Sequence, residues 1–263
     1  MAAVKRGVIW SWLVIIIGII YFFLPLLATF LFSLRAKLGV LSFKAYQNVF
    51  ADPAFLRNFS ASVMWALLAI VVGVVLFVPT AYWVRLKVPS LRPVVEFITL
   101  VPFVVPAIVY VFGLVRTYSH PPLLIVDSPA LLVFAYTILS MPYMYRAVDT
   151  GLRSIDVRTL TEAAQSLGAG WGTILFRVIF PNIRVAILSG AFLTFAIVMG
   201  EYTLAQYLVK PAFGPYMAVI GQNLAYEPAA LAILSFGLTW ASIGILQFIG
   251  RAAPGQAQVA GVK

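Results

Sequence analysis

The chain alternates between long apolar stretches and short polar segments, a pattern typical of helical membrane proteins. Six stretches reach roughly the 20 apolar residues that a helix needs to cross a bilayer. They lie at about 8–32, 60–84, 94–115, 129–148, 183–202 and 229–249. The sequence therefore predicts an all-α membrane protein with six transmembrane helices in one domain, 8–250, between a short N-terminal segment, 1–7, and a C-terminal tail, 251–263.

The first stretch is interpreted as a retained span. It follows Lys5 and Arg6, as the apolar part of a signal peptide would. A signal peptide, however, has an apolar core of about 7–15 residues and a small-residue cleavage site. This stretch is longer and lacks a clear cleavage site, so we expect it to stay in the membrane.

Composition supports lipid as the main solvent of the chain. Of 263 residues, 63% are hydrophobic and 10% are charged, whereas soluble domains are about 45–50% apolar and about 25% charged. The chain has no cysteine and one histidine, His120. Thiol catalysis and cysteine-based metal sites are therefore excluded, and we predict no metal site, no cofactor and no catalytic residue.

The basic residues are distributed unevenly between the two sides of the predicted spans. If both termini are cytoplasmic, the inner segments hold twelve of the 18 basic residues, which agrees with the positive-inside rule. The outer segment 33–59 weakens this bias, because it holds four of the other six. In that segment the helical spacing of Phe43, Tyr46 and Phe50 predicts a short helix along the outer membrane surface; the alternative is an irregular loop.

The long polar segment between the fourth and fifth stretches, 149–182, has its own helical pattern. Asp156 or Thr159 can cap a helix start, and we expect Glu162 to lie in the first turn. Gly168 suits a helix end that needs a left-handed residue. A second amphipathic run follows and ends at Pro181; its apolar positions are Trp171, Ile174, Leu175, Val178 and Ile179.

This segment resembles the cytoplasmic EAA loop of binding-protein-dependent ABC transporter permeases. The family pattern is Glu-Ala-Ala, three residues, Gly, nine residues, Ile, one residue and Leu-Pro. The chain reads Glu162-Ala163-Ala164, three residues, Gly168, nine residues, Val178, one residue and Phe180-Pro181. The two departures, Val for Ile and Phe for Leu, keep an apolar side chain. The similarity in layout covers about residues 55–250.

The resemblance implies a type I ABC importer permease in a bacterial inner membrane. It implies partners: two copies of an ABC ATPase, a second permease subunit that is identical or related, and an extracytoplasmic substrate-binding protein, with no nucleic acid. The residues implied in ATPase coupling are Glu162, Ala163, Ala164, Leu167, Gly168 and Pro181. Because the chain lacks the motif GxxxxGK[ST], we expect no ATPase site of its own.

Two features suggest where a substrate passes. Pro102 and Pro106 predict a kinked third span that lines the pathway, although a kink can also serve packing alone. Glu201 and Tyr202 lie near the outer end of the fifth span, where the acid is either functional or simply solvated. The whole chain most resembles the spermidine/putrescine branch, which implies a polyamine or related organic cation; ferric-iron and other small-solute permeases are the alternatives.

Two other function classes fit the sequence less well. An ion-coupled secondary transporter usually places ionisable groups at the membrane midplane, and the centres of these spans are nearly free of charge. A membrane-embedded enzyme needs a nucleophile with a base, or a metal site, and the sequence offers neither. The importer permease is therefore the prediction.

Overall fold

The computed structural model describes residues 2–37 and 39–251. The predicted C-terminal tail lies outside the described residues except for Arg251, which ends a helix. The chain forms two compact units, described separately here: unit 1 contains residues 1–56 and 217–238, and unit 2 contains residues 57–216 and 239–263.

Unit 1 contains the first apolar helix and a short amphipathic helix. Its elements are α1 (Ala2–Ser33), β1 (Arg35–Lys37), β2 (Val40–Leu41), α2 (Lys44–Ala51) and parts of α3 (Pro53–Leu86), α12 (Phe213–Asn223) and α13 (Glu227–Arg251). The most apolar part of α1 has no buried residue, so its side chains are available to lipid. The predicted short helix is present as α2, and its Asn48 side chain donates a hydrogen bond of 2.8 Å to the buried Glu227.

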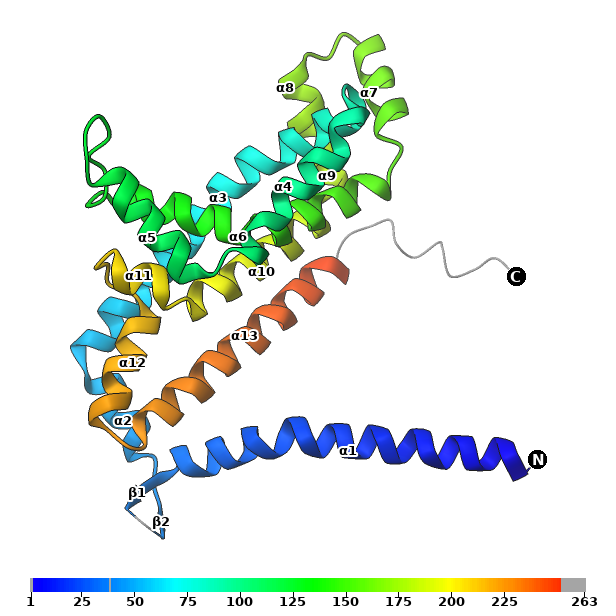
Figure 1. Cartoon of the computed structure of the whole chain (residues 1–263). Helices are drawn as coiled ribbons and strands as arrows, with labels where there is room; N and C mark the ends of the chain where they lie inside the picture. Colours follow the sequence, from blue (N-terminus) through cyan, green and yellow to red (C-terminus); the bar gives the residue numbers. More distant parts are fainter. Residues whose placement is uncertain (1, 38, 252–263) are drawn as a thin grey trace. The chain divides into compact units, whose positions relative to one another are not determined.

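Unit 2 holds most of the helices (Figure 1). Besides most of α3, it contains η1 (Pro89–Leu91), α4 (Arg92–Val104), α5 (Ala107–Tyr118), α6 (Pro129–Arg153), α7 (Val157–Ser166), α8 (Trp171–Thr173), the π-helix η2 (Ile174–Ile179), α9 (Phe180–Asn182), α10 (Arg184–Gly200) and α11 (Thr203–Tyr207). α6 starts with Pro129, and the Ser128 side chain caps it by accepting from the Ala130 amide. Proline fits this position because the first helical N–H has no intrahelical partner.

The prediction of a helical membrane protein is confirmed by these elements. Three stretches are long and apolar enough to cross a bilayer alone: Trp10–Ser33, Pro53–Leu86 and Pro129–Arg153. Two bent pairs pass the same criterion together: Pro89–Val104 with Ala107–Tyr118, and Trp171–Asn182 with Arg184–Gly200. The sixth predicted stretch falls within α13. α6 extends to Arg153, so the first part of the predicted segment 149–182 is helical.

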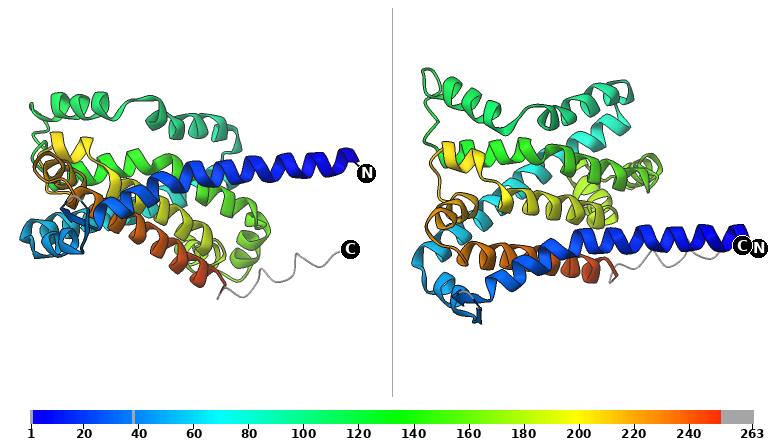
Figure 2. Two further views of the ribbon diagram at one scale, coloured as in Figure 1. Left: turned by 90° about the horizontal axis from the view of Figure 1, so that it is seen from below. Right: turned by 60° about the horizontal axis from the view of Figure 1, so that its bottom comes forward.

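The predicted third span, a single kinked helix, is wrong in detail. The chain forms two helices, α4 and α5, bent by 100° from each other. Val105 between them is extended, with φ −85° and ψ 116°. Pro106 causes this break, because it has no N–H to donate and disfavours helical geometry at the residue before it. Pro102 lies inside α4 without ending it. In both views of Figure 2, α4 and α5 lie on the same side of α6.

α6 and α10 pack closely along each other (Figure 1). A Cβ atom at Gly190 would lie 2.7 Å from Met144 Sδ and 3.2 Å from Ala147 Cβ, and a Cβ at Gly151 would collide with Ala186. Only glycine therefore permits this approach, as is common where membrane helices associate.

Two hydrophobic clusters form the core of unit 2. One joins the ends of α3 and α6 to α7, η2 and the start of α10; its members include Tyr82, Leu152, Val157, Ala164, Ile174 and Ile179. The other joins α3, α5, α6, α10 and α11; its members include Trp65, Val111, Tyr136, Val198 and Leu204. α7 is therefore anchored in a core rather than held only by its flanking loops.

Candidate functional site

α7 begins at an aspartate cap. Asp156 Oδ1 accepts a hydrogen bond of 3.1 Å from the Thr159 amide, and Oδ2 accepts one of 2.7 Å from the Thr159 hydroxyl. These two donors stabilise the charged carboxylate, so the pKa of Asp156 lies below its ordinary value. Of the two predicted caps, Asp156 is the one that acts, and Thr159 supplies the donors.

α7 has a buried face and an exposed face. Val157, Thr161 and Ala164 are buried against the core of unit 2, whereas Glu162 and Ala163 are exposed. The Tyr82 and Thr161 hydroxyl oxygens lie 2.9 Å apart inside that core. The predicted motif residues are thus divided: Ala164 anchors the helix, while Glu162 and Ala163 face outward.

Glu162 does not lie in the first turn, contrary to the prediction, because the helix begins five residues before it. Its Oε1 accepts a hydrogen bond of 2.8 Å from Arg158 Nε, one turn earlier. Both side chains are largely exposed, and exposed pairs at this spacing contribute little to stability. The Glu162 side chain therefore points toward solvent and does not cap the helix.

Gly168 ends α7 as predicted. Its φ is +79°, in the left-handed region. The Gly168 amide donates to the Gln165 carbonyl and the Ala169 amide donates to the Ala164 carbonyl, which together make a Schellman motif. A Cβ at Gly168 would meet nothing within 4 Å. Backbone geometry alone therefore requires glycine here.

The turn after α7 presents a large apolar surface. The Leu167 side chain is 88% exposed and Trp171 is 42% exposed. The Trp171 ring contacts the rings of Tyr82 and Trp83, and Lys87 Nζ lies 5.5 Å from its centroid. The sequence placed Trp171 in an amphipathic run but did not reveal these partners at the end of α3.

Pro181 lies in α9 rather than in α7 or the turn that ends it. It is exposed within α9, which ends at Asn182, one residue later than predicted. The chain then bends by 78° into α10. The second amphipathic run therefore does not continue straight into the fifth span.

Glu201 is neither solvated nor free. It is 8% exposed, and its carboxylate accepts hydrogen bonds from the Leu204 amide (2.8 Å), the Ala205 amide (3.3 Å) and the Tyr136 hydroxyl (3.2 Å). These bonds fix the start of α11 against α6. The neighbouring Tyr202 is 43% exposed.

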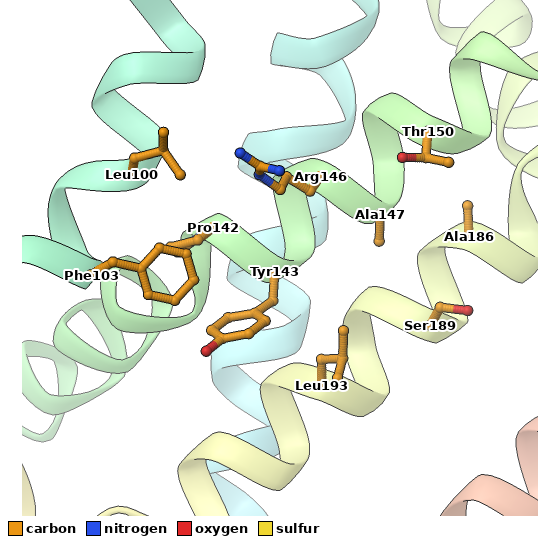
Figure 3. Close-up of a pocket in the computed structure, with 10 residues that line it drawn as sticks. All are labelled: Leu100, Phe103, Pro142, Tyr143, Arg146, Ala147, Thr150, Ala186, Ser189 and Leu193. Atoms are coloured by element: carbon orange, nitrogen blue, oxygen red, sulfur yellow. The ribbon is translucent and has the colours of Figure 1, made fainter. Parts of the chain in front are cut away.

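A cavity of about 610 Å³ opens between α4, α6 and α10 (Figure 3). Its lining is mostly apolar, with four polar side chains, Tyr143, Arg146, Thr150 and Ser189. None of the four predicted pathway residues, Pro102, Pro106, Glu201 and Tyr202, is among the ten residues that line it. We call this the Arg146 cavity.

Beside the Arg146 cavity lies a group of ion pairs between α3, α4 and α6, here called the ionic cluster: Arg85, Arg92, Glu96, Asp149 and Arg153. Asp149 is 2.6 Å from Arg153, 3.4 Å from Arg85 and 3.5 Å from Arg92. Glu96 is 2.9 Å from Arg92 and 3.3 Å from Arg153. Each acid is therefore shared by at least two arginines, which fastens the three helices together.

Comparison with known proteins places this geometry in a family. Residues 89–251 match the family model described as binding-protein-dependent transport system inner membrane component, and this range includes both α7 and the Arg146 cavity. The chain belongs to this family. The resemblance noted for the segment from Glu162 to Pro181 is thus confirmed at the level of the family.

The permease family includes relatives with different named cargoes. The chain is 31% identical over 171 residues to a probable sulfate transport permease of Chlorokybus atmophyticus, with 61% of the chain and 59% of that relative covered. It is 30% identical over 207 residues to the molybdenum permease ModB of Mycobacterium tuberculosis (73% and 74% covered). It is 25% identical over 173 residues to the spermidine/putrescine permease PotB of Escherichia coli (60% and 62% covered). The match thus spans less than two thirds of the sulfate and spermidine/putrescine relatives.

Solved ABC transporters share the fold of this permease. A chain of a bacterial transporter involved in alginate import aligns with TM-score 0.67 and 17% identity, covering 94% of this chain and 97% of the other. A chain of the MetNI methionine transporter aligns with TM-score 0.61 and 18% identity, covering 76% and 96%. The predicted type I importer fold is therefore confirmed.

Proposed function

We propose that this chain is the permease subunit of an ATP-driven importer and that α7 is the segment through which a separate ATPase acts on it. The observation that carries the proposal is the geometry of α7. One face is fixed in the core of unit 2, while Glu162, Ala163 and Leu167 face outward at the positions of the family motif. Exposed small and apolar side chains beside a helix end suit close docking of a partner.

The packing of α7 supports transmission of movement to the spans. Tyr82 ties it to α3, and the shared hydrophobic cluster ties it to α6 and α10. A displacement of α7 by a partner therefore has to shift these helices or break their contacts. Because packed helices move as nearly rigid bodies, a pull on α7 becomes a tilt of the spans.

The proposal includes the partners and the topology. Two ATPase copies would act on two permease subunits, this chain and an identical or related one, and an extracytoplasmic binding protein would deliver the cargo. The loop that holds α7 would face the cytoplasm together with both termini, in agreement with the distribution of basic residues. ATP would be hydrolysed by the partner, since this chain has no P-loop sequence.

The cargo proposal has two candidates from different charge classes. The similarity to PotB supports a polyamine, and the similarity to the sulfate and molybdenum permeases supports an oxyanion. The carboxylate of Glu201, the acid expected to attract a cation, is already occupied by three hydrogen-bond donors of the protein. The charges around the Arg146 cavity are therefore the feature that distinguishes the two cargo classes.

Reconstitution tests the proposed function. The chain, purified with its partner subunits and placed in liposomes, should take up cargo only when ATP is hydrolysed. Glu162→Lys reverses a charge on the exposed face of α7 and should uncouple hydrolysis from uptake, whereas Glu162→Gln is the matched control that keeps the shape. Uptake by the lone chain driven only by an ion gradient would contradict the proposal and favour a secondary transporter.

A further inference from the structure

Arg146 is an exposed, positively charged residue of the membrane-spanning helix α6 that lines the Arg146 cavity. It lies on α6, about 10 Å before the helix ends at Arg153, at 1.5 Å of rise per residue. Its side chain extends from α6 on the side of α4 (Figure 3).

No carboxylate of the described residues pairs directly with Arg146. Within residues 2–37 and 39–251, no ion pair to Arg146 is formed at 4.0 Å or less. Glu96 and Asp149 line a smaller neighbouring pocket together with Arg146, but both acids are held by Arg85, Arg92 and Arg153 of the ionic cluster. Arg146 is the one charged side chain among the residues that line the Arg146 cavity, and with the ionic cluster four guanidinium groups accompany two carboxylates, a surplus of two positive charges.

This surplus of positive charge favours anionic solutes over cationic ones. A charged side chain within a transmembrane segment is costly unless it faces water or a counter-ion, and such residues mark ion and substrate pathways. The walls of the cavity are mostly apolar, and low-dielectric walls focus the field of the charges that they hold. The cavity therefore attracts anions and repels polyamines.

We propose that Arg146 contacts the cargo during transport and that the cargo is a small oxyanion. This inference rests on the proposed function and names its substrate class. The planar guanidinium donates two parallel hydrogen bonds to a pair of anion oxygens, and the hydroxyls of Tyr143 and Thr150, also on α6, are further donors in the cavity lining. A volume of about 610 Å³ holds a tetrahedral oxyanion with part of its hydration shell.

Uptake by the assembled transporter in liposomes tests the substrate class, with sulfate, molybdate and spermidine as probes. We expect ATP-dependent uptake of an oxyanion and none of spermidine. Arg146→Gln should lower oxyanion uptake by about tenfold or more. Arg146→Lys keeps the charge but loses the paired N–H donors of the guanidinium, so its uptake should lie between that of Arg146→Gln and that of the natural chain. Arg116→Gln, at the exposed end of α5, is the control for loss of one charge elsewhere and should transport normally.

Different results would overturn the substrate class and the proposed permease function. Uptake of spermidine but of neither oxyanion overturns the substrate class, while ATP dependence still supports an importer permease. Unchanged oxyanion uptake in Arg146→Gln also overturns it, because the side chain would then only extend to the membrane surface. Absence of ATPase association, measured separately by co-purification, would instead overturn the proposed function.

A second measurement does not depend on the folding of an Arg146 variant. The natural chain has no cysteine, so Ser189→Cys introduces one reactive thiol into the Arg146 cavity. An anionic methanethiosulfonate should label it about tenfold faster, relative to a cationic one, than it labels Ser166→Cys on the exposed side of α7. Sulfate or molybdate should slow the labelling. The same ratio of anionic to cationic labelling rates at Ser189→Cys and Ser166→Cys, without protection, would overturn the proposal.

Discussion

The Tyr82 hydroxyl on α3 donates a hydrogen bond to the Thr161 hydroxyl on α7 across 2.9 Å. The direction follows from the second bond of Thr161, whose single hydroxyl hydrogen is donated to the Val157 carbonyl at 2.6 Å. Both side chains are almost fully buried. This bond is a direct polar tie between α7 and a membrane span, so it connects the proposed docking surface with the part of the protein that has to move.

Removing this tie should loosen α7 without unfolding the permease. Tyr82→Phe leaves the ring contact with Trp171 but removes one buried hydrogen bond, a loss of about 1 kcal/mol. Amide hydrogen exchange in α7 should then be about fivefold faster, with lower transport per ATP hydrolysed. Tyr46→Phe in unit 1, which removes the hydroxyl contact to Ser33, is the control. Unchanged exchange in α7 would refute the role of Tyr82.

Gly168 should tolerate only residues that accept left-handed geometry. A β-branched residue at φ +79° costs at least about 1–2 kcal/mol, whereas asparagine costs less. Gly168→Val should therefore reduce the amount of ATPase subunit that co-purifies, and Gly168→Asn should retain most of it. Gly172→Val is the matched control, because Gly172 is equally open but has no positive φ. Equal loss in both valine variants would show that side-chain size, not backbone geometry, matters.

The Asp156 cap should make the order of α7 depend on pH in a defined direction. Because the Thr159 donors lower its pKa, the cap stabilises α7 fully above the ordinary aspartate value of 3.8 and is lost as pH falls through the lowered pKa. Exchange protection of α7, corrected for intrinsic rates, should stay constant from neutral pH and decrease only in that acid range. Asp156→Asn should show no such step, and Asp156→Ala should be several-fold less protected at every pH, because loss of an N-cap costs about 1 kcal/mol. A step near pH 6 would contradict this assignment.

Glu201 should prove to be a positioning residue for α11 rather than a cargo contact. Glu201→Gln keeps one acceptor oxygen but turns the other into a donor that faces the backbone N–H of Leu204 or of Ala205. The cost of such a buried mismatch is about 1–3 kcal/mol, which thermal unfolding in detergent can detect. Tyr136→Phe, which loses a single bond of 3.2 Å, should cost less. If Glu201→Gln lost uptake while its thermal stability stayed unchanged, Glu201 would instead be a cargo contact.

The sequence was sufficient for features governed by local chemistry. The apolar stretches located the membrane helices, and Asp156 and Gly168 marked the two ends of α7 because capping depends on neighbouring residues alone. The break between α4 and α5 was only half predicted: Pro106 indicated a kink, but a bend of 100° depends on what α4 and α5 pack against. The 78° bend before α10 had no local signal that we recognised.

Features created by tertiary contacts could not be predicted from the pattern. Tyr82 read as one of many aromatic residues near a membrane surface, and its partner Thr161 follows it by 79 positions in the chain. Arg146 counted only as one more inner basic residue, since its importance depends on which acids are already paired. Glu201 was correctly singled out as unusual, yet whether it was solvated, functional or capping depended on the fold of residues 201–205.

The docking of α7 onto an ATPase is the central claim, and site-directed cross-linking tests it directly. Leu167→Cys places the only thiol of the chain at an 88% exposed position beside α7, and Leu124→Cys, 67% exposed, places one before the start of α6 as a control. With a short thiol-reactive cross-linker on the assembled transporter, Leu167→Cys should be joined to the ATPase subunit and Leu124→Cys should not. A cross-link to the ATPase from Leu124→Cys, with none from Leu167→Cys, would contradict the account.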